Sequence, residues 1–218
     1  MKTCPVCKQE IPAHREICRD CMKAQKWQGW VEEKELQKLF PLRIVSFLDT
    51  FALKSKIKLN RKDIEGFSKG FGLFLCGAAG TGKTMYAAAI LMELKRRSYM
   101  DYDGGYIQGA FVNVSDLLAE IKAGFETNQS TDVVQKYSQA DVLILDDLGQ
   151  QKATEWAIDT LGMIINNRYE HLRPIIITSN ADLQYIAKWC GDDRMPSRIS
   201  EMCQIVHFTN KDYRISQK

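Results

Sequence analysis

The chain has 218 residues and a formal charge of +3, with 45% hydrophobic and 26% charged residues. This length accommodates one ordinary domain and a small appendage, and the composition excludes a disordered or fibrous protein. No apolar stretch approaches the roughly 20 residues that span a bilayer, and a cysteine pair stands where a signal peptide would be apolar. We therefore expect a cytoplasmic protein with no membrane partner.

The first 30 residues contain six basic and three acidic side chains, and so account for the whole net charge. Zinc bound there by four thiolates would lower the charge of that segment to about +1. The basic excess is thus weak evidence for a nucleic-acid partner.

Two CxxC pairs near the N-terminus, Cys4 with Cys7 and Cys18 with Cys21, are separated by ten residues. Each pair can direct two sulfurs at one tetrahedral ion, so the spacing predicts a closed zinc site. Free thiols and a redox motif are the alternatives, although no strand–helix unit surrounds either pair. We expect residues 1–25 to fold as a zinc-binding module. The other cysteines are expected in the core: Cys76, Cys190 and Cys203.

A polar, helix-prone segment follows the cysteines and is ended by Pro41. Residues 26–41 are interpreted as a helical linker and residues 42–218 as the main domain. Trp27 and Trp30 share one face of such a helix. We expect them to pack on the main domain; the alternatives are docking to a partner helix and stacking with single-stranded nucleic acid.

From Gly70 onward, short apolar runs alternate with helical stretches, which predicts a parallel sheet in an α/β sandwich. The expected strands are Phe71–Cys76, Phe111–Val114, Val142–Asp146, Ile175–Ser179 and Gln204–Phe208. The expected helices lie near Lys83–Arg97, Ser115–Phe125, Thr154–Leu172 and Leu183–Trp189.

The first of these strands runs into a segment that fits GxxxxGK[ST], the loop that binds nucleotide phosphates before a helix. Its residues are Gly77, Ala78, Ala79, Gly80, Thr81, Gly82, Lys83 and Thr84. Lys83 is expected to reach the β- and γ-phosphates of ATP, and the Thr84 hydroxyl to ligate Mg²⁺. Tyr86, two positions further on, is included among the expected nucleotide contacts. A plain glycine-rich turn is the alternative.

Polar residues follow two later strands at the sheet edge where ligands bind in such folds. Asp146 is expected to hold Mg²⁺, and Asp147 to align or deprotonate the attacking water. Asn180 could orient that water from the opposite side. The alternatives are a capping role for the two acids and a simple turn at Asn180.

These motifs, with residues 164–169 (IINNRY) and 174–180 (PIIITSN), resemble AAA+ ATPases of the DnaC and DnaI type, to which the transposition protein IstB is related. The resemblance spans about residues 71–214 and implies a three-layer AAA+ sandwich. Residues 193–198 (DRMPSR) resemble the family segment in which an arginine reaches a neighbour's ATP. The resemblance implies that Arg198 is the arginine finger, Arg194 its helper and Asn180 the sensor 1 residue. A solvated helix start is the alternative for both arginines.

Two departures from the family pattern affect the expected activity. Asp147 stands where many AAA+ enzymes have glutamate, which favours slow or partner-dependent hydrolysis. Only 38 residues follow Asn180, so we expect no full C-terminal lid, with Arg214 as a partial substitute for the second sensor. An open site favours self-association with ATP at the interface.

The resemblance therefore implies a loader of a replicative helicase of the DnaB type, which handles ATP and single-stranded DNA. By analogy, the zinc module grips the helicase. The alternative is an IstB-like transposition ATPase that binds duplex DNA and directs a transposase. A small-molecule kinase is disfavoured, because no acceptor pocket is evident in the sequence.

Overall fold

The computed structural model describes residues 1–18, 20–22, 33–47, 59–101, 107–209 and 212–213. Trp27, Trp30 and Arg214 lie outside these ranges, so the roles expected for them stay predictions. Among the described residues, none of the helices combines the length and apolar character that crossing a membrane requires.

The N-terminal segment forms a small antiparallel pair of strands, β1 (Lys2–Thr3) and β2 (Glu10–Ile11). Its buried residues are few: Ile11 packs with Cys4 and Cys18. So small an apolar cluster needs another source of folding energy, as expected for a metal-dependent module.

Two short helices precede the main sheet, α2 (Glu33–Leu39) and α3 (Leu42–Phe47). As expected, the helix before Pro41 ends there, and the next helix begins directly after the proline, where a missing N–H costs nothing. Leu36 and Phe40 are buried in one cluster with side chains of the sheet and of the long helix that follows it. The end of the predicted linker therefore packs on the main domain.

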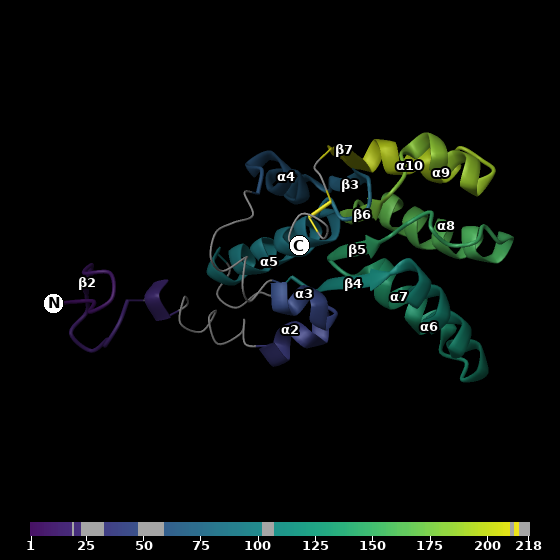
Figure 1. The fold of residues 1–218 in the computed structure, drawn as a ribbon. Helices are drawn as coiled ribbons and strands as arrows, with labels where there is room; N and C mark the ends of the chain where they lie inside the picture. Colours follow the sequence, from purple (N-terminus) through teal and green to yellow (C-terminus); the bar gives the residue numbers. More distant parts are fainter. Residues whose placement is uncertain (19, 23–32, 48–58, 102–106, 210–211, 214–218) are drawn as a thin grey trace.

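The main sheet has five parallel strands, in the order β4-β5-β6-β3-β7 (Figure 1). The strands are β3 (Gly72–Gly77), β4 (Gly109–Asn113), β5 (Val142–Asp146), β6 (Ile175–Ser179) and β7 (Cys203–Phe208). All five were expected within one or two residues, which confirms the α/β class. Because every strand points the same way, the residues that follow them gather at one edge.

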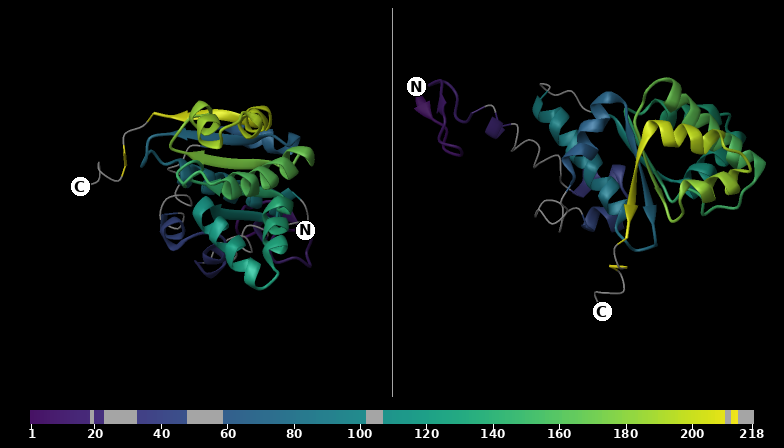
Figure 2. Two further views of the ribbon diagram at one scale, coloured as in Figure 1. Left: turned by 90° about the vertical axis from the view of Figure 1, so that its right-hand side faces the viewer. Right: turned by 90° about the horizontal axis from the view of Figure 1, so that it is seen from above.

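Helices cover both faces of the sheet and complete a three-layer sandwich (Figures 1 and 2). One layer holds α2, α3, α4 (Arg61–Glu65) and α5 (Lys83–Asp101), with a 3-10 turn at Gly66–Lys69. The other holds α6 (Val114–Glu126), α7 (Ser130–Gln139), α8 (Glu155–Glu170), α9 (Leu183–Cys190) and α10 (Arg194–Met202). Neighbouring residues of one strand enter opposite cores: Leu73 and Leu75 pack with α5, whereas Phe74 and Cys76 pack in the cluster of α6–α10. Cys76, Cys190 and Cys203 are buried as expected.

Two helices of the second layer, α7 and α10, were not among the expected elements. The sequence of α7 is mostly polar, with only Tyr137 and Ser138 buried. Helix α10 carries Pro196 in its first turn, where the backbone N–H has no helical acceptor in any case. A polar segment and an early proline both weaken the sequence signal for a helix.

Candidate functional site

The glycine-rich loop joins the end of β3 to the first residue of α5. Gly77, Gly80 and Gly82 have φ values of 142°, 75° and 96°, a region that side chains rarely adopt. The Thr81 hydroxyl donates to the Ala78 carbonyl over 2.8 Å and fixes the turn. The curled backbone and the N-terminus of α5 together form a concavity of the kind that binds anions, and phosphate binding by the loop stays a prediction.

Lys83 connects this loop to the end of β6. Its side chain is buried, and its ammonium donates to the carbonyls of Gly77 and Ala78 over 2.7 Å each and to Asn180 Oδ1 over 2.9 Å. Two parts of the site that were predicted from separate motifs are thus in direct contact. A lysine held here lies where it can meet the phosphates of a nucleotide in the loop.

Asp146, at the end of β5, faces Thr84 across the sheet edge. One carboxylate oxygen, Oδ1, accepts hydrogen bonds from Thr84 Oγ1 over 2.8 Å and from Thr178 Oγ1 over 2.7 Å. Burial raises the pKa of the Asp146 carboxyl, and the nearby charge of Asp147 adds to the effect. A hydroxyl and a carboxylate in contact provide the oxygen ligands that Mg²⁺ prefers, so the residues fit the expected ion.

Asp147 has a left-handed backbone conformation, with φ of 63°. Its N–H donates to Thr178 Oγ1 over 2.9 Å, so Thr178 contacts both acids. The side-chain amides of Gln150 and Asn113 donate to the Asp147 carboxylate over 3.0 and 3.4 Å. Sequence reasoning missed Thr178, Asn113 and Gln150 as site residues. The available signal was that Asn113 ends a strand, as Asp146 does.

Tyr86 lies on the first turns of α5, on the side of the loop that faces α4. Its hydroxyl donates to Asp63 Oδ2 over 2.6 Å and accepts from the Asn60 N–H over 3.1 Å. Its ring packs edge-on against Phe208, with centroids 5.5 Å apart. Burial and the Asp63 carboxylate raise the pKa of Tyr86 to about 12, so the hydroxyl stays protonated. A contact between Tyr86 and the nucleotide stays a prediction.

The two predicted trans-acting arginines lie on α10, in the layer of α6–α10. Arg194 is exposed and donates two hydrogen bonds to Asp192 Oδ2, over 2.8 and 3.1 Å. The Arg198 guanidinium carbon lies 6.0 Å from the ring centre of Tyr169, whose hydroxyl donates to Glu201. Both arginines therefore have local partners, and an action on a neighbour's ATP stays a prediction.

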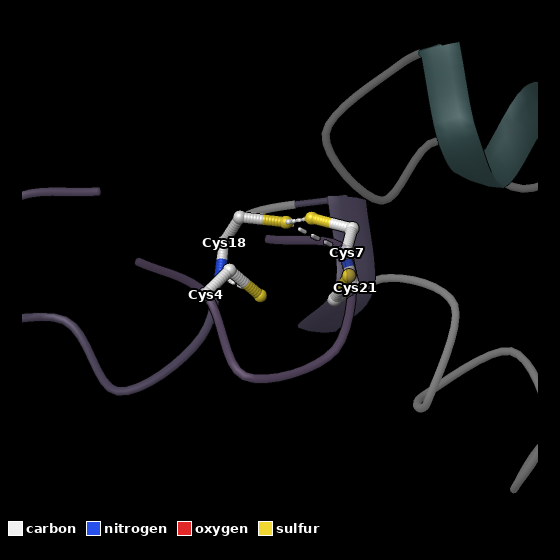
Figure 3. Close-up of side chains that lie close together, drawn as sticks. All are labelled: Cys4, Cys7, Cys18 and Cys21. Carbon is white, nitrogen blue, oxygen red and sulfur yellow. Dashed lines mark hydrogen bonds between the residues drawn. The ribbon is translucent and has the colours of Figure 1, made fainter. Parts of the chain in front are cut away.

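The four N-terminal cysteines converge on one point (Figure 3). All four sulfurs lie within 4.8 Å of one another, and those of Cys7 and Cys18 are 3.5 Å apart. A tetrahedron with 2.3 Å zinc–sulfur bonds has edges of about 3.8 Å, so the cluster fits zinc closely. Backbone N–H groups of Cys18 and Cys21 point at the sulfurs of Cys4 and Cys18, over 3.4 and 3.3 Å. Backbone donors at Cys7 and Cys18 lower the pKa of Cys4 to about 6, whereas the hydrogen bond to the Cys18 sulfur raises the pKa of Cys21, so without an ion only part of the cluster favours the thiolate form.

An aromatic and basic surface, which we name the α6–α8 patch, is formed by Lys122, Phe125 and Trp156. The Lys122 ammonium lies 4.8 Å from the centre of a Trp156 ring, and Phe125 meets that residue edge-on at 6.1 Å. Phe125 is 54% exposed although it is a large apolar side chain. This patch was not predicted, because its two aromatic residues are 31 positions apart in the sequence.

A short segment of chain joins Asp147 to this patch. The Gln151 side chain donates to the Asp147 carbonyl over 2.9 Å, and the Trp189 indole donates to the Gln151 carbonyl over 2.8 Å. Thr154 then caps α8, of which Trp156 is the second residue. Hydrogen bonds thus hold Gln151 to the turn at Asp147 and to α9, and the chain continues from Gln151 through Thr154 to the α6–α8 patch.

Comparison with known proteins agrees with this geometry. The model of the family described as "IstB-like ATP binding protein" matches residues 65–218, which is more than half of the chain. The replicative helicase loader DnaI of Bacillus subtilis is 30% identical over 113 residues, covering 51% of this chain and 34% of its own. The putative ATP-binding protein of insertion sequence IS5376 from Geobacillus stearothermophilus is 29% identical over 150 residues, covering 67% and 56%.

Among solved structures, the crystal structure of the DnaC helicase loader is similar, with a TM-score of 0.56 and 23% identity over 78% of this chain and 93% of the other. This likeness confirms the predicted AAA+ fold. The chain spans from about a third to just over half of the length of the curated relatives it matches.

Proposed function

The chain belongs to the family of IstB-like ATP-binding proteins, and from this premise we propose that it is an ATP-switched loader of a replicative helicase of the DnaB type that contacts single-stranded DNA. In this proposal ATP occupies the loop of residues 77–84, and hydrolysis is slow and depends on partners.

The observation that carries the proposal is the α6–α8 patch and its connection to Asp147. Exposed aromatic rings stack with nucleic-acid bases of any sequence, and a lysine beside them neutralises phosphate charge. Phe125 offers an exposed ring, and Lys122 lies over Trp156 in the same patch. A kinase for small molecules has no use for such a surface, whereas a protein that switches its hold on a DNA strand needs one linked to its nucleotide site.

The residues of the nucleotide site have distinct roles in this proposal. Lys83 meets the β- and γ-phosphates, and Thr84 and Asp146 hold Mg²⁺, which would supply charge neutralisation at the phosphates. Asp147, steadied by Asn113 and Gln150, orients or deprotonates the attacking water.

Three further side chains complete the site in the proposal. Asn180 senses the γ-phosphate, because its side-chain oxygen accepts a hydrogen bond from Lys83, which meets that phosphate in the proposal. Arg198, assisted by Arg194, stabilises the transition-state charge in a neighbouring subunit, so hydrolysis requires assembly.

In the proposal, the zinc module binds the helicase. Its four-cysteine cluster supports a rigid, metal-held unit at the N-terminus. The relationship to proteins named replicative helicase loaders supports a DnaB-type partner.

A second candidate function is that of a transposition ATPase acting on duplex DNA. It is favoured by the match to the IS5376 protein, which covers a larger share of this chain than the match to DnaI. The two candidates differ in the DNA that they bind and in the protein that they retain.

The test compares two phenylalanines of similar exposure: Phe125 in the α6–α8 patch, 54% exposed, and Phe71 just before β3, 50% exposed. Phe125→Ala should weaken binding of the ATP-bound protein to a single-stranded oligonucleotide by roughly tenfold, the usual loss for one stacked base. Phe71→Ala should leave that affinity unchanged. Binding should be measured by fluorescence anisotropy, with duplex DNA as competitor and with a DnaB-type helicase in a parallel co-purification.

Equal losses in the two variants would contradict the assignment of the patch. A preference for duplex DNA without retention of the helicase would support the transposition ATPase instead. Lys83→Ala separately tests the nucleotide site: the folded variant should lose ATP binding, because a charge-assisted contact to the phosphates is removed.

A further inference from the structure

Two described residues beyond β7, Asp212 and Tyr213, lie against the glycine-rich loop, and they directly precede in the sequence Arg214, for which the sequence predicted a role at the nucleotide site. Strand β7 ends at Phe208, which pairs with Gly77 at the base of the loop. Four and five residues later, Asp212 and Tyr213 lie against the loop itself. The Tyr213 N–H donates to the Gly80 carbonyl over 3.0 Å, and its ring lies 3.9 Å from where a Cβ of Gly82 would be.

The carboxylate of Asp212 lies directly over Gly80. A Cβ built on Gly80 would overlap all three atoms of that carboxylate group. Only glycine therefore leaves room for Asp212 at this point, in addition to tolerating the φ of 75°. Asp212 is partly buried in this position.

This location has an electrostatic consequence. The loop and the N-terminus of α5 form a field that attracts anions, and the ammonium of Lys83, which donates to the carbonyls of Gly77 and Ala78, adds to it. A carboxylate against the loop interacts favourably with that field. Nucleotide phosphates carry several negative charges and need the same field, so the two anions oppose each other at short range.

We propose that Asp212 is an intramolecular competitor of ATP: its carboxylate occupies the edge of the phosphate-binding loop, and nucleotide binding displaces the Asp212–Tyr213 segment. The inference rests on the proposed nucleotide site and adds an intramolecular contact that lowers the affinity of that site for ATP. A protein with this contact stays nucleotide-free until ATP is abundant or a partner draws the segment away.

The experiment measures the affinity of the full chain for a fluorescent ATP analogue with Mg²⁺. Asp212→Asn and Asp212→Ala should each bind about tenfold tighter, a gain that corresponds to about 1.4 kcal/mol. Asp132→Asn is the matched control, because it removes the same charge from an exposed position on α7 and should bind like the parent. Raising the salt concentration should reduce the gain, since the opposed charges are partly exposed to solvent.

A second readout follows the segment without reference to activity. The Tyr213 N–H is hydrogen-bonded to the Gly80 carbonyl in the structure and should exchange with solvent faster when ATP is bound. Protection that is unchanged or increased by ATP would overturn the displacement.

The variants also separate this inference from the nucleotide site on which it rests. Unchanged or weaker ATP binding in both Asp212 variants would overturn the competition, as would a gain confined to Asp212→Asn, since the new amide would then explain it. If Lys83→Ala retains full ATP affinity, the proposed nucleotide site itself is wrong. If Lys83→Ala loses ATP binding while Asp212→Ala gains nothing, only the competition fails.

Discussion

Replacing Asp146 by asparagine should abolish the Mg²⁺-dependent part of ATP binding and at the same time stabilise the nucleotide-free fold. Asparagine has almost the same shape, and its Oδ1 can accept the two hydrogen bonds that Thr84 and Thr178 now donate. What disappears is the charge, which is buried at 4% exposure and lies beside Asp147. A buried charge next to a like charge is costly, so its removal should favour folding.

The expected gain in the free energy of unfolding is on the order of 1 kcal/mol, the usual size of relief when an active-site conflict is removed. Asp146→Ala is the matched control. It removes the charge but also the acceptor, and the fully buried Thr178 hydroxyl loses that partner. The Thr178 oxygen still accepts from the Asp147 N–H, but its O–H donor has no acceptor. A buried unsatisfied donor costs about 1–3 kcal/mol, so the alanine variant should be less stable than the parent.

The measurement is denaturant unfolding without nucleotide, followed by ATP titration with and without Mg²⁺. The pKa of the Asp146 carboxyl is raised in the folded state, so the folded protein binds a proton at this group more tightly than the unfolded chain does. The parent should therefore approach the stability of Asp146→Asn as the pH falls through the folded pKa, while its Mg²⁺ affinity decreases. An asparagine variant less stable than the parent at neutral pH would refute the claim that this carboxylate is a net cost.

Three further predictions follow from other parts of the molecule. Protein purified without chelators should carry about one zinc per chain, and chelation should unfold the N-terminal module alone, as monitored by elemental analysis and circular dichroism; metal-free protein would contradict the site. Mixing Arg198→Ala chains with Asp146→Ala chains should restore part of the ATP hydrolysis that each variant lacks, because one kind of mixed interface has both groups intact. An ATPase activity no greater than the sum of the residual activities of the two variants would exclude action of Arg198 in trans. Asn113→Asp keeps the cap that Asn113 provides to Ser115 but repels Asp147, so kcat should fall with little change in nucleotide affinity; an unchanged kcat would argue against Asn113 as a positioning residue.

The parts of the candidate site that a sequence can indicate are those that depend on short, fixed spacings. The phosphate loop, the two CxxC pairs and the acids after an apolar run each bring chemistry together within a few residues. The strands were readable because a strand buried on both faces forms a continuous apolar run, as in residues 142–145.

The rest of the site depends on register between strands, which a single sequence does not reveal. Leu145 pairs with Ile177, so Thr178 comes to lie beside Asp146, and Asn113 pairs with Asp146 on the other side. In the sequence, Thr178 is an ordinary β-branched residue of a strand. The contact between Lys83 and Asn180 joins residues 97 positions apart, and the packing of the sheet alone brings them together.

The turn after β5 is the part of the chain through which the proposed switch would couple the nucleotide site to the α6–α8 patch. Asp147 and Gly149 both have positive φ, at 63° and 85°, and a Cβ on Gly149 would be only 2.5 Å from the side chain of Ile186. A non-glycine residue in this conformation costs on the order of 1 kcal/mol, and it is held by hydrogen bonds from Gln150 and Gln151 and to Thr178. A change in the contacts of the Asp147 carboxylate would therefore strengthen or weaken the hydrogen bonds that hold this conformation. Gln151 also accepts a hydrogen bond from the Trp189 indole, and the chain reaches Trp156 five residues later, so one short stretch of chain joins this strained turn to the α6–α8 patch.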